Sequence, residues 1–239
     1  RAPHTGYVVS KQVPTYGSVV QRLRDKFPEA DIDTIVARAR KLVDRVFPVF
    51  LTREAAFLKL LQRDLPEQYK CRVPQVLAVE KGPDKLVRRM HVNWLRMGGS
   101  PLPQLEFARQ ASDLLRVLHD EVGLIHLDLR LDNVVITPEG VGFVDFGSAV
   151  RVNEDLKESP MLRSLFDEMM STSQIQRVLG RMKDSGKLTS EFILNAHQRV
   201  DKAVDLFYLA VQMRNPHTCP ELRPLIRYDK DSEAARRIS

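Results

Sequence analysis

The sequence predicts an α+β fold, in which a small N-terminal sheet with helices precedes a mostly helical C-terminal part. Three observations predict it. Short β-branched runs bounded by turn residues lie before residue 95, apolar residues recur at helical spacing in other segments, and a strongly amphipathic helix covers 105–121. A polar stretch after residue 92 separates the two parts, so we expect one unit at 1–95 and a second at 96–239.

The N-terminal sheet is predicted from three strand-like runs. The first covers 7–13 and ends before Pro14, and the other two cover 73–79 and 85–94. Gly, Pro and Asp lie between the last two runs, and this composition is typical of a turn. These two strands are therefore expected to be neighbours along the chain, joined by a short connection.

Two helices are expected directly after the first strand. Apolar residues at helical spacing cover 18–27 and 31–46, and Asp31 or Asp33 suits the cap of the second helix. We interpret these helices as an insertion at about 18–46. Further helical segments are expected between residues 161 and 200.

Composition argues against several classes of protein. Hydrophobic residues make up 43% and charged residues 28%, which is ordinary for a globular protein, and no apolar run approaches the roughly 20 residues of a membrane span. The net charge is +6, but the basic residues are scattered, which favours solvated faces over a nucleic-acid surface. Cys71 and Cys219 lack His partners at metal spacing, so we expect reduced cysteines and an intracellular, cytoplasmic protein.

One segment carries the chemistry of the chain. Residues 126–133 read His-Leu-Asp-Leu-Arg-Leu-Asp-Asn, and Asp145 opens the sequence Asp-Phe-Gly at 145–147. Between them, two β-rich runs flank Thr-Pro-Glu-Gly and read as a hairpin, which would place Asn133 beside Asp145. Two oxygen donors at one mouth suit Mg²⁺, and a carboxylate and a cation nearby suit the transfer of a phosphoryl group from a nucleotide triphosphate.

The segment resembles the catalytic and metal-binding loops of the eukaryotic-type protein kinase family, H-x-D-L-x-x-x-N followed by D-F-G. The resemblance implies a two-lobed protein kinase-like fold, with a possibly truncated N-lobe at 1–95 and a C-lobe at 96–239. It implies that Asp128 accepts the proton of a substrate hydroxyl and that Arg130 balances charge on the γ-phosphate. It further implies ATP as cofactor and two Mg²⁺ ligands, which would be Asn133 and Asp145.

One residue departs from the family pattern in an informative way. Leu127 occupies the position where many kinases have the Arg that binds a phosphorylated activation loop. The resemblance therefore implies activity without that switch. The family's glycine-rich loop is also missing from the sequence, which is consistent either with a lost start of the chain or with another way of covering phosphate.

The phosphate-anchoring lysine and its partner are predicted from the same resemblance. The strand that ends in Val-Val-Ser-Lys, with Lys11 last, resembles the family's V-A-I-K, and Lys41 is the alternative. Glu54 would be the partner, on a helix expected over 53–62 with Thr52 as its cap.

The segment that joins the two lobes is expected to bind the adenine ring. Asn93, Trp94 and Leu95 resemble this linker, whose exposed backbone groups would meet the base. Asp205 resembles the buried Asp that receives backbone N–H groups of the catalytic loop in this family, although an ordinary first-turn acid is the alternative.

Three functions remain open from the sequence. The first is an ATP- and Mg²⁺-dependent kinase acting on Ser or Thr hydroxyls of a protein substrate. The second is a small-molecule kinase of the kind that modifies antibiotics or choline, which has the same fold and base. The third is a pseudokinase scaffold, although a scaffold has no chemical need for Asp128, Arg130, Asn133 and Asp145 together.

Overall fold

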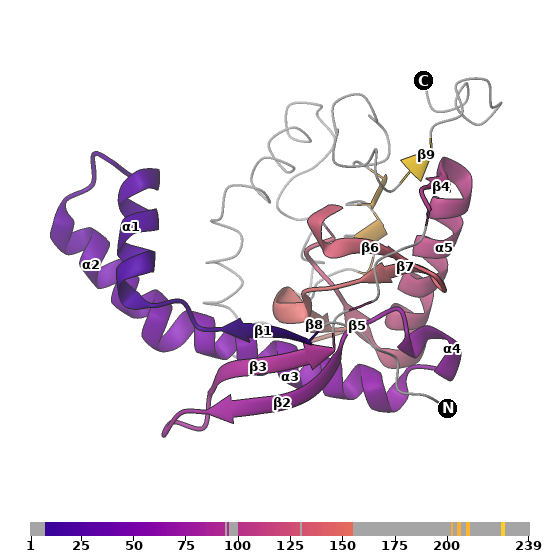
Figure 1. The fold of residues 1–239 in the computed structure, drawn as a ribbon, viewed down its shortest axis with the longest axis horizontal. Coiled ribbons are helices and arrows are strands. Elements are labelled where there is room, and N and C mark those ends of the chain that lie inside the picture. Colours follow the sequence, from indigo (N-terminus) through magenta and orange to yellow (C-terminus); the bar gives the residue numbers. More distant parts are fainter. Residues whose placement is uncertain are drawn as a thin grey trace.

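A computed structural model describes residues 8–93, 95, 100–129, 131–154, 202, 205–206, 209–210 and 226–227. The N-terminal part contains an antiparallel sheet of three strands in the order β1-β3-β2 (Figure 1). The strands are β1 (Val8–Gln12), β2 (Gln75–Lys81) and β3 (Val87–Asn93). All three predicted strands are confirmed, with bounds that shift by at most two residues.

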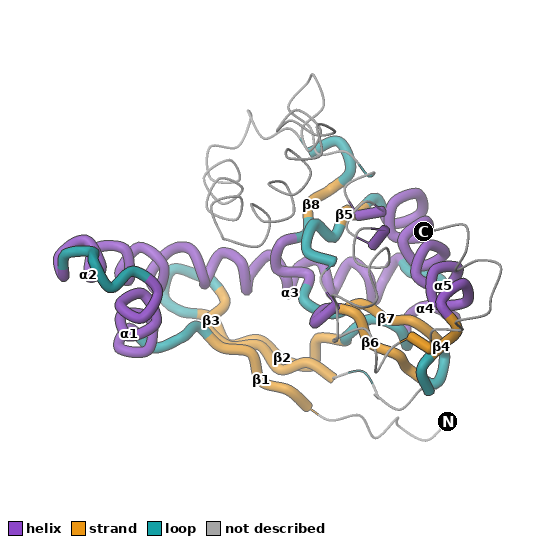
Figure 2. Tube along the Cα trace, turned by 90° about the horizontal axis from the view of Figure 1, so that it is seen from above, coloured by secondary structure: helices purple, strands orange, loops and turns teal. Residues whose placement is uncertain are grey.

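The predicted insertion forms two helices that lie at one end of the molecule (Figures 1 and 2). They are α1 (Tyr16–Lys26) and α2 (Ile32–Lys41). The Asp31 side chain caps α2 by accepting a hydrogen bond of 2.8 Å from the backbone N–H of Thr34, which confirms one of the two predicted caps. Leu23 and Ala39 are among the buried residues that hold the two helices together.

The third helix is longer than predicted, and its predicted cap is wrong. From α2 the chain continues through π-helical turns at Leu42–Val46 directly into α3 (Phe47–Asp64). Thr52 lies inside α3, where its hydroxyl donates to the Pro48 carbonyl at 2.7 Å and accepts from the Val87 backbone N–H at 2.8 Å. Pro48 has no N–H to donate to the preceding π-helical turns, yet the chain stays helical through it, and the Val43 carbonyl in those turns accepts from the Arg88 guanidinium at 3.4 Å.

The C-terminal part is built around one helix and one hairpin. The amphipathic helix forms α5 (Gln104–Arg116), which runs into π-helical turns at Val117–Val122 and ends at Gly123, whose φ of 74° suits a left-handed cap. The hairpin joins β6 (Val134–Thr137) to β7 (Gly140–Phe143). The remaining short elements are α4 (Glu67–Lys70), β4 (Leu102–Pro103), β5 (Leu124–Ile125), β8 (Val150–Arg151) and β9 (Ile226–Arg227).

The hairpin confirms its prediction with one correction. The turn contains only Pro138 and Glu139, because Thr137 pairs with Gly140, so the second strand begins two residues earlier than expected. The helices expected between 161 and 200 lie outside the described residues. Within the described part of the chain, no helix is long and apolar enough to cross a membrane.

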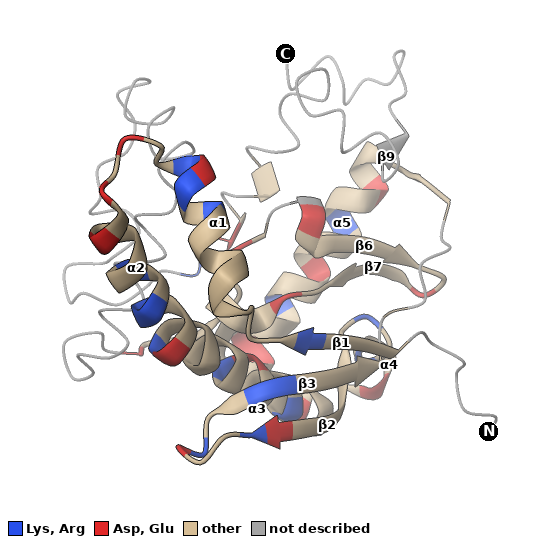
Figure 3. Cartoon of the chain, turned by 60° about the vertical axis from the view of Figure 1, so that its left-hand side comes forward, with Lys and Arg blue, Asp and Glu red and all other residues tan. Residues whose placement is uncertain are grey.

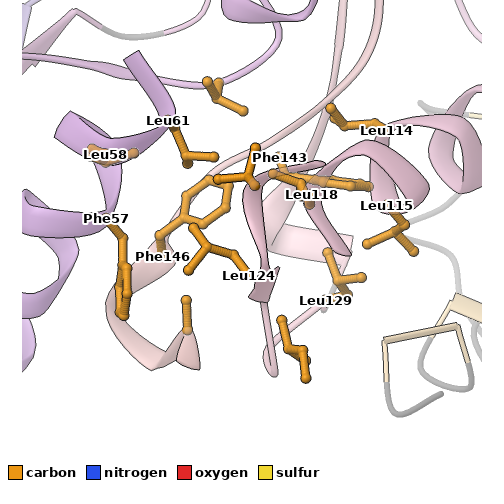
Figure 4. Close-up of a cluster of buried hydrophobic side chains, with 14 of the residues drawn as sticks. Phe57, Leu58, Leu61, Leu114, Leu115, Leu118, Leu124, Leu129, Phe143 and Phe146 are labelled. Carbon is orange, nitrogen blue, oxygen red and sulfur yellow. The ribbon is translucent and has the colours of Figure 1, made fainter. Parts of the chain in front are cut away.

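A single hydrophobic core joins the two parts. Leu58 and Leu61 of α3 pack in the same cluster as Leu114 of α5 and as Phe143 and Phe146 beside the hairpin (Figure 4). All five side chains are at most 1% exposed. Because α3 also packs against β2 and β3, this core fixes the sheet and the hairpin relative to each other.

Arg72 provides a second, polar connection to the hairpin. It is only 6% exposed, and its guanidinium donates to the carbonyls of Val141 at 2.6 Å and Gln110 at 2.8 Å. Its own carbonyl accepts the Phe143 N–H at 3.0 Å and lies 2.6 Å from where a Cβ of Gly142 would be. Glycine is therefore required at 142 by this close approach of two backbones.

Substitution of Arg72 with methionine is expected to lower the free energy of unfolding by about 2–3 kcal/mol, because buried carbonyls lose a charged donor. Urea unfolding followed by circular dichroism measures this change. The matched control is Arg63→Met, since the Arg63 side chain is 73% exposed and pairs with its neighbour Asp64. Equal stability of both variants would contradict a structural role for Arg72.

Candidate active site

Three predicted site residues meet at one point, although they are distant in the sequence. The Nζ atom of Lys11, on β1, lies 2.6 Å from Oε1 of Glu54 on α3 and 3.2 Å from Oδ1 of Asp145. These contacts span 43 and 134 residues of the chain. Lys41, the alternative lysine, is exposed at the end of α2. Of the two lysines, Lys11 is therefore the one that the structure places beside Glu54.

The electrostatics of this triad follow from burial and from the charges of its members. Burial lowers the pKa of Lys11, but the charges of Glu54 and Asp145 outweigh it, so the net effect raises the pKa. Glu54 is 4% exposed, and its burial raises the pKa of the carboxyl, while Lys11 opposes that change. Lys11 thus stays charged at neutral pH, and Glu54 depends on it as its cationic partner.

Asp145 adopts an unusual backbone conformation. Its φ is 65°, in the left-handed region that non-glycine residues rarely occupy, and Leu127 in the other motif has a φ of 64°. The Asp145 side chain is 45% exposed and is held by Lys11 on one side. Such strain persists where surrounding contacts hold it, and it gathers at functional sites.

The second half of the site consists of Asp128 and Asn133. The Asn133 amide nitrogen donates to the backbone carbonyl of Asp128 at 2.8 Å and to its Oδ2 at 3.1 Å. Asn133 is 4% exposed, and its own backbone carbonyl accepts the Val144 N–H at 2.9 Å, directly before Asp145. The hairpin therefore brings the ends of the two motifs together, as its sequence predicts.

His126 fixes the start of this loop. Its Nε2 lies 3.0 Å from the Val144 carbonyl, and its Nδ1 accepts the Asp128 N–H at 3.3 Å. These two bonds fit the tautomer with the proton on Nε2. The ring also packs against Phe146, with 4.7 Å between the ring centroids.

Asp205 holds the same loop through hydrogen bonds to its backbone. It is fully buried and accepts the backbone N–H groups of His126 at 2.7 Å and Leu127 at 2.8 Å. A third contact of 2.9 Å joins it to Nε2 of His119. This arrangement confirms the predicted contact with the catalytic loop rather than an ordinary first-turn acid.

The oxygen donors of this site suit Mg²⁺ better than a metal ion that is held by protein side chains alone. The described residues contain no group of three or more His, Cys, Asp or Glu side chains that could hold a metal. Because the Asn133 amide nitrogen donates to Asp128, its oxygen would be the atom that binds a cation, and the Asp145 carboxylate would supply a second oxygen donor. Two hard oxygens suit Mg²⁺, which retains waters and binds substrate phosphates as its other ligands.

The remaining predicted site residues are only partly described. Arg130 and Trp94 lie outside the described residues. Asn93 ends β3, where it pairs with Val8 and Gln75, and Leu95 is buried among Val135 and Val144.

Sequence reasoning missed two residues that organise the site. Arg53 precedes Glu54 on α3 and donates to the Ala149 carbonyl at 3.0 Å, which ties α3 to the chain that follows Asp145. His119 contacts Asp205 from the turns after α5. Neither residue belongs to a motif. The one hint in the sequence is that Arg53 directly precedes Glu54 in the helix expected over 53–62.

Comparison with known protein families agrees with this geometry. A model of a phosphotransferase enzyme family, APH, matches residues 83–151, a stretch that includes Asp128, Asn133 and Asp145. The predicted kinase-like superfamily is confirmed. The match supports a kinase-like phosphotransferase, while Lys11 and Glu54 lie outside the matched residues.

Among solved structures, the kinase-like chain is similar to the complex of Rv3197 with erythromycin from Mycobacterium tuberculosis, at 17% sequence identity and a TM-score of 0.37. The likeness covers 86% of this chain and 66% of that one, so the chain spans just under two thirds of its length. No curated protein matches the sequence.

Proposed function

We propose that this kinase-like chain transfers the γ-phosphoryl group of ATP to a hydroxyl group in a reaction that depends on Mg²⁺. The contact of Lys11 with both Glu54 and Asp145 is the observation that carries the proposal. It places a cation beside the predicted metal ligand, and the second pair, Asp128 and Asn133, is joined to that ligand through the hairpin. Positioning and charge neutralisation are what phosphoryl transfer requires of a protein.

Each residue has a role that follows from its place. Glu54 holds Lys11 on β1, so that the ammonium group meets the phosphates of the nucleotide. Asn133 orients the Asp128 carboxylate, which aligns the acceptor hydroxyl and takes its proton. Bound Mg²⁺, held by Asn133 and Asp145, would neutralise charge on the phosphate oxygens. Arg130 would balance charge on the γ-phosphate, and Asn93, Trp94 and Leu95 would lie at the adenine.

The acceptor we favour is a small molecule. The match to the phosphotransferase enzyme family, APH, over the segment that carries Asp128, Asn133 and Asp145 is the observation that supports it. A Ser or Thr hydroxyl of a protein is the second candidate, and the sequence Asp145-Phe146-Gly147 favours it. Both candidates use the same residues, so the acceptor and not the mechanism separates them.

The test is transfer of labelled phosphate from ATP by the purified protein in the presence of Mg²⁺. One reaction contains a metabolite extract and another contains a mixture of protein acceptors. Labelled metabolites without labelled protein would support the favoured acceptor, and labelled protein alone would support the second. Absence of transfer to either acceptor, together with retained ATP binding in a thermal-shift assay, would overturn the enzymatic proposal in favour of a scaffold.

A Lys11→Met variant is expected to lose about 10- to 100-fold in ATP affinity, because a charged contact to phosphate disappears. Isothermal titration with the Mg²⁺ complex of a non-hydrolysable ATP analogue measures it. Lys59→Met is the matched control, since Lys59 is exposed on α3. Unchanged affinity in the Lys11 variant would show that another residue anchors the phosphates.

A further inference from the structure

Three consecutive residues of α3 contact three different parts of the structure. The Thr52 hydroxyl accepts the backbone N–H of Val87 on β3 at 2.8 Å, and Glu54 holds Lys11 of β1 at 2.6 Å. Arg53, between them, contacts the C-terminal part. Because successive residues of an α-helix are rotated by about 100°, these side chains leave the helix in three directions. Within one turn, α3 is therefore attached to β3, to β1 and to the C-terminal part.

The guanidinium of Arg53 makes two contacts through one nitrogen atom. Nη2 donates to the Ala149 carbonyl at 3.0 Å and lies 3.5 Å from Oε2 of Glu154. Ala149 is fully buried, and a buried carbonyl requires such a donor. The side chains of the ion pair are 17% and 19% exposed, so water screens their charges only in part. The Glu154 carboxylate is itself held, since it accepts the Arg151 backbone N–H at 2.8 Å.

The segment that Arg53 contacts is the downstream support of Asp145. Upstream of Asp145 lies the hairpin, and downstream the chain makes one 3-10 turn at Phe146–Ser148, which Ala149 closes by donating its N–H at 3.1 Å to the first carbonyl of the turn. The strand β8 follows directly and pairs with β5. Because Asp145 has a φ of 65°, its conformation depends on contacts on both sides. Arg53 supplies a contact on the downstream side.

The neighbouring charges of α3 couple this segment to the lysine of the site. Acidic and basic residues are interspersed along α1, α2 and α3 (Figure 3), so an Arg beside a Glu is not unusual by itself. Their partners distinguish them, because Glu54 pairs with Lys11 and Arg53 pairs with Glu154. Adjacent positions on one helix move together. A shift of the segment after Asp145 would therefore disturb the pair of Glu54 and Lys11 unless Arg53 released its contacts.

We propose that Arg53 is a positioning residue for Asp145, the proposed Mg²⁺ ligand. Its contacts with Ala149 and Glu154 hold the segment after Asp145 against α3, and the Asp145 carboxylate thereby keeps its place 3.2 Å from Lys11. Arg53 acts through this segment and touches neither nucleotide nor metal. The inference rests on the proposed function, because it assumes that Asp145 binds Mg²⁺ together with the nucleotide.

The test compares the affinity for a non-hydrolysable ATP analogue in Mg²⁺ and in EDTA by isothermal titration, and it requires no phosphoryl transfer. Mg²⁺ is expected to strengthen binding to the native protein. Arg53→Met is expected to reduce that gain about tenfold, the lower end of what groups that hold a metal ligand contribute. The affinity in EDTA should stay unchanged, because Lys11 and Glu54 are intact. Methionine can still cover the Phe57 ring, whose centroid lies 5.1 Å from the guanidinium carbon.

Three further variants separate position from stability and charge. Arg53→Lys is expected to restore most of the gain from Mg²⁺, since one ammonium nitrogen can replace the one guanidinium nitrogen that makes both contacts. Thr52→Val loses the acceptor of the Val87 N–H, so it should unfold at lower urea concentration but keep the gain. Arg63→Met makes the same substitution at an exposed position of α3 and should match the native protein.

Several outcomes would overturn the role of Arg53. They are a native gain from Mg²⁺ in Arg53→Met, an equal loss of that gain in Thr52→Val, an Arg53→Lys variant no better than Arg53→Met, and a native protein that gains no affinity from Mg²⁺. A native protein that gains affinity from Mg²⁺ but transfers no phosphate would contradict the proposed function alone, and the titrations of the variants would still decide the role of Arg53.

Discussion

Replacement of Asp128 with asparagine is expected to lower the rate of phosphoryl transfer about 10²- to 10⁴-fold, because the side chain can no longer take the proton of the acceptor hydroxyl. The geometry of the loop should survive, since asparagine keeps an oxygen that accepts from the amide of Asn133. The affinity for ATP should also remain, because Lys11 and Asp145 are unchanged. Steady-state rates with labelled ATP, compared with nucleotide titrations, separate the two effects.

Asp132 offers a matched control for this variant. It lies four residues later in the same loop, in the short 3-10 turn Leu131–Asn133, and it is exposed. Asp132→Asn removes the same charge without touching the base, so its rate should stay close to that of the native protein. If both variants lost activity equally, the loss would reflect the charge of the loop and not proton transfer by Asp128.

Substitution of Asp205 with alanine is expected to destabilise the protein by about 3–5 kcal/mol, because three buried donors would lose their acceptor. Two of these donors are the backbone N–H groups of His126 and Leu127, and the third is His119. The strained conformation of Leu127, with its positive φ, would lose its support as well. Urea unfolding measures the stability, and the transfer assay should show a loss of activity in the folded fraction.

An acidic residue of the same region provides the comparison for Asp205. Asp120 binds Lys202 at 2.7 Å in an exposed ion pair, so Asp120→Ala should change stability little. Asp205→Asn should fall between the two variants, since it retains one acceptor for the backbone N–H groups. If the Asp205→Ala variant were as stable as the native protein, the other contacts of the catalytic loop would be sufficient to hold it.

The catalytic hairpin could be predicted because its signals are local. The order of the motifs, the β-branched runs and the turn residues all lie within residues 126–147, and a tight hairpin leaves few ways to arrange its ends. The contact between Asn133 and the residue before Asp145 followed from that geometry. The superfamily and the fold were accessible from the same short stretch.

Contacts between residues that are distant in the sequence were harder to predict. Lys11 and Lys41 both precede Glu54 in the chain, and only the packing of α3 against the sheet decides which lysine reaches it. The start of α3 was missed because Thr52 resembles a helix cap, whereas the chain enters the helix earlier, from continuous π-helical turns.

The close approach at Gly142 has a consequence for how the distance between the two motifs is set. With no room for a methyl group between position 142 and the carbonyl of Arg72, main chain rests on main chain there. Backbone atoms therefore help to fix the position of the hairpin that carries Asn133 at one end and Asp145 at the other. A side chain at 142 would push the hairpin away from the Arg72 carbonyl and displace both magnesium-binding candidates together.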